Sequence, residues 1–290
     1  LCLIACIPQQ VMAQKQSRME KLLRYLNDND ADKWQKNREK LDDETKAYYA
    51  EDLSLMDVLN DLWNGQSEQA ATLYFGCYEK AAQSNFPGIC EGEKIPLSQI
   101  RDKADQSIIN LLEASKDKIP FSRALLDSIH ATEYPVDSAM LQRLQNIREV
   151  ALLEGMLKAP TPIIYQTYVK EYPNGKFIAQ VNASENVRLY QLVKTAPTPA
   201  NFKAFFEDPE MQKYYQDRGP RPYLAEVRTL YDDFLFQRID SLKKEGNATA
   251  IRQIIDDYKN TPYLSTGART HLNDLEYLSD CLLYTSPSPR

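Results

Sequence analysis

Four acidic side chains near the N-terminus have the spacing of calcium ligands. Asp28, Asp30 and Asp32 alternate along the chain, and Glu39 stands at the twelfth position of the same stretch. A calcium-binding loop of this kind turns sharply at its sixth position, where glycine is required. Lys33 occupies that position here. We therefore expect Asp30 or Asp32 to cap a helix, and we expect no metal site.

Two cysteines could form a disulfide. Five cysteines are present, and Cys77 and Cys90 are the two that lie away from the chain ends. In an oxidising compartment we expect such a pair to be bridged. The bridge would close a loop of about 15 residues and would stabilise the fold by roughly 3 kcal/mol. The alternative is one buried and one exposed free thiol.

No catalytic motif is present in the sequence. It contains no P-loop, no dinucleotide-binding glycine cluster, and neither GxSxG nor HExxH. The two histidines, His130 and His271, stand alone in helical segments, so we expect them to pack or face solvent. The net charge is -6 and no run of Lys and Arg occurs, which argues against a nucleic-acid partner. We expect a non-enzymatic chain without a cofactor.

The N-terminus indicates export. An apolar stretch over residues 1–7 is followed by Pro8, and the pattern resembles the end of a secretory signal peptide cleaved after Ala13. A second interpretation is a lipobox at residues 3–6, in which Cys6 would carry a lipid anchor, and a third is an intact buried segment. No stretch is apolar enough for a transmembrane helix. We expect a protein that is periplasmic or associated with the outer membrane of a bacterium.

The last ten residues, CLLYTSPSPR at 281–290, differ from the preceding chain. They match one reading frame of a transposon-end adapter used in preparing DNA sequencing libraries. We interpret them as translated adapter, with the genuine sequence breaking off near Asp280. The alternative is a natural Ser/Pro tail.

Composition and periodicity predict an all-α fold. The chain has only 9 Gly and is rich in Lys, Glu, Leu, Ala and Gln. Met140, Leu144, Ile147 and Ala151 recur at the spacing of a buried helical stripe. A loop with two prolines and two glycines is expected at 85–96. We expect an N-terminal helical region over residues 14–158, with helices at 18–26, 31–41, 44–65, 66–83, 97–115, 121–130 and 136–158.

Residues 159–280 contain internal repeats. The string APTP occurs at 159–162 and again at 196–199, a shift of 37 residues. A shift of 86 residues aligns the segment 165–178 with 251–264, and it also places the turn residue Asn174 on Asn260. We predict three helical hairpins with irregular pitches of 37 and 49 residues. The shift of 37 places Tyr165 on Phe202 and Tyr168 on Phe205. We expect these aromatic residues and their neighbours to form the core between repeats: Tyr165, Tyr168, Tyr172, Phe202, Phe205 and Phe206.

Two segments carry a resemblance to a known family. IIYQTYVKEYPNGKFIAQVNASENVRLYQL at 163–192 and IIDDYKNTPYLSTGARTHLNDLEYL at 254–278 resemble the tetratricopeptide-like repeats of exported bacterial envelope proteins, such as outer-membrane assembly lipoproteins. The resemblance covers residues 160–280 and extends only weakly to the rest. The chain departs from the family in lacking its Trp and Leu-Gly signature and its pitch of 34. The resemblance implies a solenoid that binds peptide or protein partners on its concave face.

An irregular insertion, EDPEMQKYYQDRGPRPY at 207–223, supplies the candidate partner-binding residues. Tyr190, Tyr214, Tyr215 and Tyr223 lie in or near it. Loops carry function more often than the helices they join, and Tyr is favoured at interfaces. We expect these four side chains to be exposed and to contact a partner.

These observations favour a non-catalytic, helical-repeat scaffold for protein interactions in the cell envelope. One alternative is the N-terminal adaptor of a larger enzyme whose catalytic domain follows residue 280. Another is a glycan-binding envelope protein. Sugar sites usually stack on Trp, and the chain has only Trp34 and Trp63, which weakens that second alternative.

Overall fold

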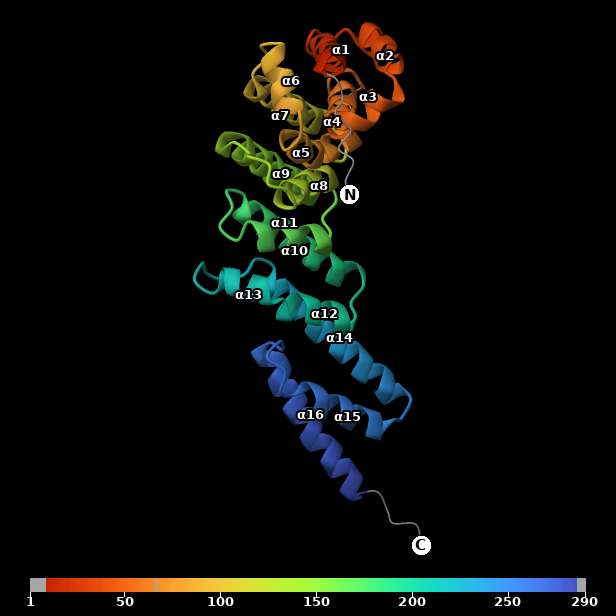
Figure 1. The fold of residues 1–290 in the computed structure, drawn as a ribbon. Coiled ribbons are helices and arrows are strands. Elements are labelled where there is room, and N and C mark those ends of the chain that lie inside the picture. Colours follow the sequence, from red (N-terminus) through yellow and green to blue (C-terminus); the bar gives the residue numbers. More distant parts are fainter. Residues whose placement is uncertain (1–8, 66, 286–290) are drawn as a thin grey trace, which may run out of the picture. The chain divides into compact units, whose positions relative to one another are not determined.

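The computed structural model describes the backbone of residues 9–65 and 67–285, and the side chains of 11–65 and 67–277. Within these ranges the chain forms helices joined by short connections, and no strand occurs in the described residues (Figure 1). The predicted all-α, helical-repeat fold is confirmed. The chain divides into two compact units, Leu1–Leu152 and Leu153–Arg290. The division falls inside α9 (Ser138–Lys158), a few residues before the predicted domain boundary after residue 158.

The N-terminal unit is a cluster of helices, and the first part of α9 is its last element. Its elements are α1 (Gln9–Asn27), α2 (Ala31–Glu39), α3 (Asp43–Tyr48), α4 (Ala50–Asn60), a π-helical turn (Asp61–Gly65), α5 (Glu68–Ala82), α6 (Phe86–Gly92), α7 (Leu97–Ala114) and α8 (Lys118–His130).

The acidic pattern at residues 28–39 caps a helix, as predicted. Asp30 is the N-cap of α2, and its carboxylate accepts a hydrogen bond of 3.1 Å from the backbone nitrogen of Lys33. Its other oxygen pairs with Lys33 Nζ at 2.7 Å. Side-chain caps of this kind satisfy the otherwise unpaired amides of the first helical turn.

Two local predictions in this unit were wrong. The segment 44–65 does not form one helix, because α3 ends at Tyr48 and α4 begins at Ala50, and the segment closes with the π-helical turn. The expected loop at 85–96 contains α6. Pro87 stands in the first turn of α6, where its missing N–H costs nothing, and Phe86, Ile89 and Cys90 are buried. Burial of these apolar side chains outweighs the weak helix propensity of the two glycines.

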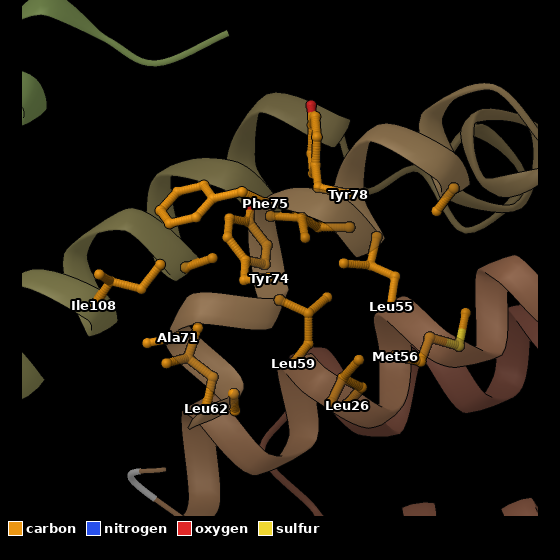
Figure 2. Packing of buried hydrophobic residues seen from close by; sticks show 14 of the residues in the cluster. Leu26, Leu55, Met56, Leu59, Leu62, Ala71, Tyr74, Phe75, Tyr78 and Ile108 are labelled. Atoms are coloured by element: carbon orange, nitrogen blue, oxygen red, sulfur yellow. The ribbon is translucent and has the colours of Figure 1, made fainter. Parts of the chain in front are cut away.

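The core of the N-terminal unit forms where α5 packs against α4 and α8. Figure 2 shows Tyr74, Phe75 and Leu59 converging there among other apolar side chains. Tyr134 completes this aromatic cluster, with its ring centroid 4.9 Å from that of Phe75 and 5.1 Å from that of Tyr78. The Tyr134 hydroxyl donates to the buried carboxylate of Asp105.

Cys77 and Cys90 are both free thiols in the structure, so the predicted disulfide between them is absent. Cys77 is half-buried on α5, and its sulfur lies 3.5 Å from Ser54 Oγ of α4. Cys90 is buried on α6, where loss of solvent raises the pKa of its thiol to about 12. The Cys77 side chain is thus held in a contact with α4 instead of a bond to α6.

The described part of the C-terminal unit contains the end of α9 and seven further helices. These are α10 (Pro162–Glu171), α11 (Ile178–Thr195), α12 (Pro199–Glu207), α13 (Pro209–Tyr215), α14 (Leu224–Lys244), α15 (Ala248–Tyr258) and α16 (Thr266–Thr285). Consecutive helices pack against each other in the pairs α10 with α11, α11 with α12, α14 with α15, and α15 with α16. Phe202 of α12 also contacts Tyr231 of α14, with ring centroids 5.0 Å apart.

The repeated APTP string begins two helices in the same way. Thr161 caps α10 by accepting from the backbone nitrogen of Ile164 at 3.2 Å, and Thr198 caps α12 by accepting from that of Asn201 at 3.3 Å. A proline follows each threonine at the first helical position. The aromatic residues of the repeat are core, as predicted, since five of the six are buried and Tyr172 is half-buried: Tyr165, Tyr168, Phe202, Phe205 and Phe206.

The predictions for the two chain ends stay predictions. Cys6, the possible lipid-anchor site, lies outside the described residues. The expected cleavage position after Ala13 falls within α1, which begins at Gln9. At the other end, α16 continues to Thr285 and so enters the segment interpreted as adapter.

Candidate functional site

The insertion at 207–223 breaks the regular succession of hairpins in the C-terminal unit. Asp208 ends α12 and caps the short helix α13, accepting from the backbone nitrogen of Met211 at 2.8 Å. The chain then turns back to α14 through Gly219, at φ +98°, and Tyr223, at φ +63°. A tyrosine in the left-handed region is strained, and such strain persists only where the surroundings impose it.

Arg221 anchors this turn to α11 and α12. Its Nε donates to Asn186 Oδ1 of α11 at 2.6 Å, and its Nη1 donates to the backbone carbonyl of Phe205 in α12. The guanidinium also lies over the Phe205 ring, 4.0 Å from the centroid. Asn186 Nδ2 donates in return to the carbonyl of Pro222 at 3.2 Å. These contacts fix the path of the chain into α14.

The positive charge of Arg221 is buried without an ion pair among the described residues. Only 9% of the residue is exposed, and Nη2 has no hydrogen-bond partner in the described structure. The two carboxylates whose charges act on the pKa of Arg221 are engaged elsewhere. Glu185 forms two hydrogen bonds of 2.6 and 2.7 Å with Arg188, and Asp208 caps α13. Burial is the main cause of the lowered pKa of Arg221.

An open pocket of about 730 Å³ lies beside the insertion. Its cationic lining residues are Lys213, Arg221 and Arg228, and none of the described residues that line it carries a carboxylate. Its aromatic lining residues are Phe206, Tyr215 and Tyr263. Pockets of 300–1,000 Å³ that combine apolar walls with a few charged groups are typical of ligand sites.

One aromatic wall of the pocket is a parallel ring stack. Phe206 of α12 and Tyr263, in the turn between α15 and α16, have centroids 4.3 Å apart and planes 4° apart. The Tyr263 hydroxyl donates to Glu207, and burial together with this carboxylate raises the pKa of Tyr263. The Tyr263 hydroxyl therefore points toward Glu207, and the Tyr263 ring forms part of the pocket wall.

The structure places the four predicted partner-binding tyrosines in two pairs. Tyr190 of α11 stacks on Tyr223, with centroids 4.3 Å and planes 10° apart. Tyr214 and Tyr215 of α13 make an edge contact at 5.0 Å, and Tyr215 lines the pocket. The expectation that all four are exposed was wrong. Tyr223 is 37% exposed, whereas the others are half-buried because they contact one another or the insertion.

Several pocket residues were not predicted from the sequence. Lys213, Arg221 and Arg228 are ordinary surface residue types, and Tyr263 is separated from Phe206 by more than fifty positions. The string RGPRP at 218–222 was the available signal. A glycine and two prolines beside two arginines indicate a fixed turn that presents positive charge.

Neither a metal site nor a membrane-spanning helix is found in the described part of the chain. No group of three or more His, Cys, Asp and Glu residues is arranged there to hold a metal ion. None of the described helices is long and apolar enough to cross a membrane. His271 packs against Phe236, with ring centroids 4.9 Å apart, as expected for a packing residue.

Comparison with known proteins gives no match: no protein-family model, curated protein or solved structure matches the chain. The fold therefore defines the class, an all-α protein built from helical hairpins. The resemblance to tetratricopeptide-like envelope proteins stays a prediction.

Proposed function

We propose that this chain is an exported, non-catalytic helical-repeat protein that acts as a scaffold for protein interactions in the bacterial cell envelope. The observation that carries the proposal is the insertion at 207–223. It is held rigidly by Arg221 against α11 and α12, and it borders a pocket with aromatic and cationic walls. Tyrosine and arginine are the residue types that contribute most to binding energy at protein interfaces.

The repeats support this proposal through their packing. Five aromatic residues of α10 and α12 are buried in the core, so these helices form a support for the insertion. The insertion interrupts their regular succession and keeps Tyr223 accessible at its end. A rigid scaffold that presents a preformed surface loses little conformational entropy on binding a partner.

The two tryptophans are not available as sugar-stacking platforms. Trp34 is buried, and Lys103 Nζ lies over the half-buried ring of Trp63, 3.9 Å from its centroid. These placements favour a protein partner over the glycan alternative.

Photo-crosslinking tests the proposal. A benzophenone amino acid at position 223 is expected to form a discrete adduct with one envelope protein when the intact chain is irradiated in envelope extracts of the bacterium that encodes it. Excess unlabelled chain should compete the adduct away. The control places the same group at Leu73, which is 51% exposed on α5. Absence of any adduct at 223, or the same adducts at both positions, would reject the proposal.

A further inference from the structure

The pocket beside the insertion has an excess of positive charge. Lys213 and Arg228 are exposed at its lining, and neither forms an ion pair with another described residue. In the same unit, Lys203 pairs with Glu207 and Lys259 with Asp256. Three cations, Lys213, Arg221 and Arg228, thus share one pocket whose described lining provides no carboxylate.

Arg221 adds a charge that the protein itself does not neutralise. Its guanidinium is buried at the pocket, with Nη2 unpartnered among the described residues. A buried cation is costly unless an anion lies close to it, and charges interact more strongly where water is excluded. Leu224, the first residue of the 21-residue helix α14, also lines the pocket. The positive end of that helix dipole adds to the attraction for an anion.

The surroundings limit the kind of anion. A neighbouring hollow of about 480 Å³ shares Pro209 with the pocket, and its lining has four carboxylates, those of Glu185, Glu207, Asp208 and Glu210. Two cations, Arg188 and Lys203, also line it and pair with Glu185 and Glu207, so its net charge is negative. The negative charge that remains, on Asp208 and Glu210, would repel a long, uniformly charged polyanion. The stacked rings of Phe206 and Tyr263 offer apolar contact beside the cations. A ligand that alternates carboxylate and apolar groups over a short length matches both features.

We propose that the pocket binds a short acidic peptide segment of a partner protein, with its carboxylates at Lys213 and Arg228 and its apolar side chains against Phe206 and Tyr263. This inference rests on the proposed scaffold function and specifies the chemistry of the partner. The buried positive charge of Arg221 stabilises the bound carboxylates, and its hydrogen bonds to α11 and α12 hold the insertion in place.

A designed peptide tests the proposal on the full chain. The probe is a fluorescein-labelled hexapeptide of alternating Glu and Phe, and the matched probe has Gln in place of each Glu. Fluorescence polarisation is expected to show binding of the Glu peptide and about tenfold weaker binding of the Gln peptide. Raising the salt from about 50 mM to about 300 mM should weaken only the binding of the Glu peptide, because exposed charges are screened.

Matched variants locate the site. The double variant Lys213→Ala with Arg228→Ala is expected to bind the Glu peptide about tenfold more weakly, since each exposed cation contributes a fraction of a kcal/mol or more when it faces a carboxylate. Both side chains are exposed and unpaired, so the fold should be retained, as circular dichroism will verify. The control is Lys244→Ala, an exposed cation on α14 away from the pocket.

Equal binding of the two peptides, or an unchanged affinity in the double variant, would overturn the proposal. Displacement of the Glu peptide by inorganic phosphate or by oligogalacturonate at lower concentration than by unlabelled peptide would also overturn it, in favour of a phosphate or an acidic glycan. Crosslinking at position 223 distinguishes a failure of the acidic-segment inference from a failure of the proposed scaffold function. An adduct that persists in the double variant while the peptide fails to bind rejects the acidic segment and retains the scaffold function.

Discussion

Each of the two units buries an ionisable side chain that is held by hydrogen bonds, Arg221 in one and Asp105 in the other. Arg221 holds the insertion through a hydrogen bond to Asn186 and another to the Phe205 carbonyl, and it does so without an ion pair among the described residues. In the N-terminal unit, Asp105 is a buried carboxylate that receives a hydrogen bond from Tyr134. Loss of solvent is the dominant influence on the pKa of both groups.

Asp105 makes stability depend on pH. Burial raises its pKa from 3.8 to about 6 in the folded chain, although the Tyr134 hydrogen bond opposes the shift. Between these two values the folded chain binds the proton more tightly than the unfolded chain does. Stability therefore falls as the pH rises through this window, and the loss is complete above about pH 6. Asp52, hydrogen-bonded by Ser84 at 2.6 Å, has the same raised pKa of about 6 and the same sign.

Asp105→Asn is expected to reduce this pH dependence. The amide stays neutral, and its oxygen can still accept from Tyr134. The fall in melting temperature between about pH 5 and about pH 7 should therefore be smaller, by a few degrees, than in the unaltered chain. Thermal unfolding followed by circular dichroism measures the difference. Asp117→Asn, at an exposed position, should leave the pH profile unchanged. An identical profile in Asp105→Asn would show that Asp105 is ionised without penalty.

Helix starts in the C-terminal unit follow from pairs of adjacent residues. A residue before proline is restricted to extended backbone, and Thr161 and Thr198 adopt it with ψ of 150° and 154°. Their hydroxyls then reach the amide three residues ahead, and the proline supplies the first helical position. The same short string thereby sets the first residue of both α10 and α12.

Removal of these caps is expected to destabilise the C-terminal unit. Thr161→Ala and Thr198→Ala should each lower the free energy of unfolding by about 1 kcal/mol, because an amide of the first turn loses its partner. Urea denaturation measures the change. The serine variants at the same positions keep the hydroxyl and should retain most of the stability. Serine variants as unstable as the alanine variants would assign the effect to packing of the threonine methyl group.

At the scale of the whole molecule, the chain folds as two units whose cores use different clusters of aromatic residues. The N-terminal unit centres on Tyr74, Phe75 and Tyr134, whereas the C-terminal unit centres on Tyr168 and the phenylalanines of α12. Tyr168 is fully buried, and its hydroxyl accepts a hydrogen bond of 3.1 Å from the backbone nitrogen of Phe177. A change at this residue should therefore act on its own unit.

Tyr168→Asp is expected to unfold the C-terminal repeats cooperatively. It places an unpaired charge in a core and creates a cavity, at a cost of about 4 kcal/mol. Hydrogen exchange read by mass spectrometry should show loss of protection over 162–277 and retained protection over 18–130. The control is Ile163→Asp on the same helix, where the native side chain is 76% exposed. Unchanged protection in Tyr168→Asp would place Tyr168 outside the core.

The sequence by itself determined the features that depend on neighbours within a few positions. These are the helical class, the capping by Asp30, the start of α10 and α12, and the buried aromatic faces of the repeats. Helical hydrogen bonds join residues four apart, and a helix buries every third or fourth side chain. Both can therefore be read from local spacing.

Only the tertiary structure decided which distant side chains meet. It folded the Gly- and Pro-containing segment around Phe86 into α6, and it left Cys77 and Cys90 as free thiols. It also brought Phe206 of α12 to one pocket with Arg221 and Tyr263, which lie in two different connections between helices. Such meetings depend on the summed burial and charge of many contacts far apart in the chain, which no local spacing records.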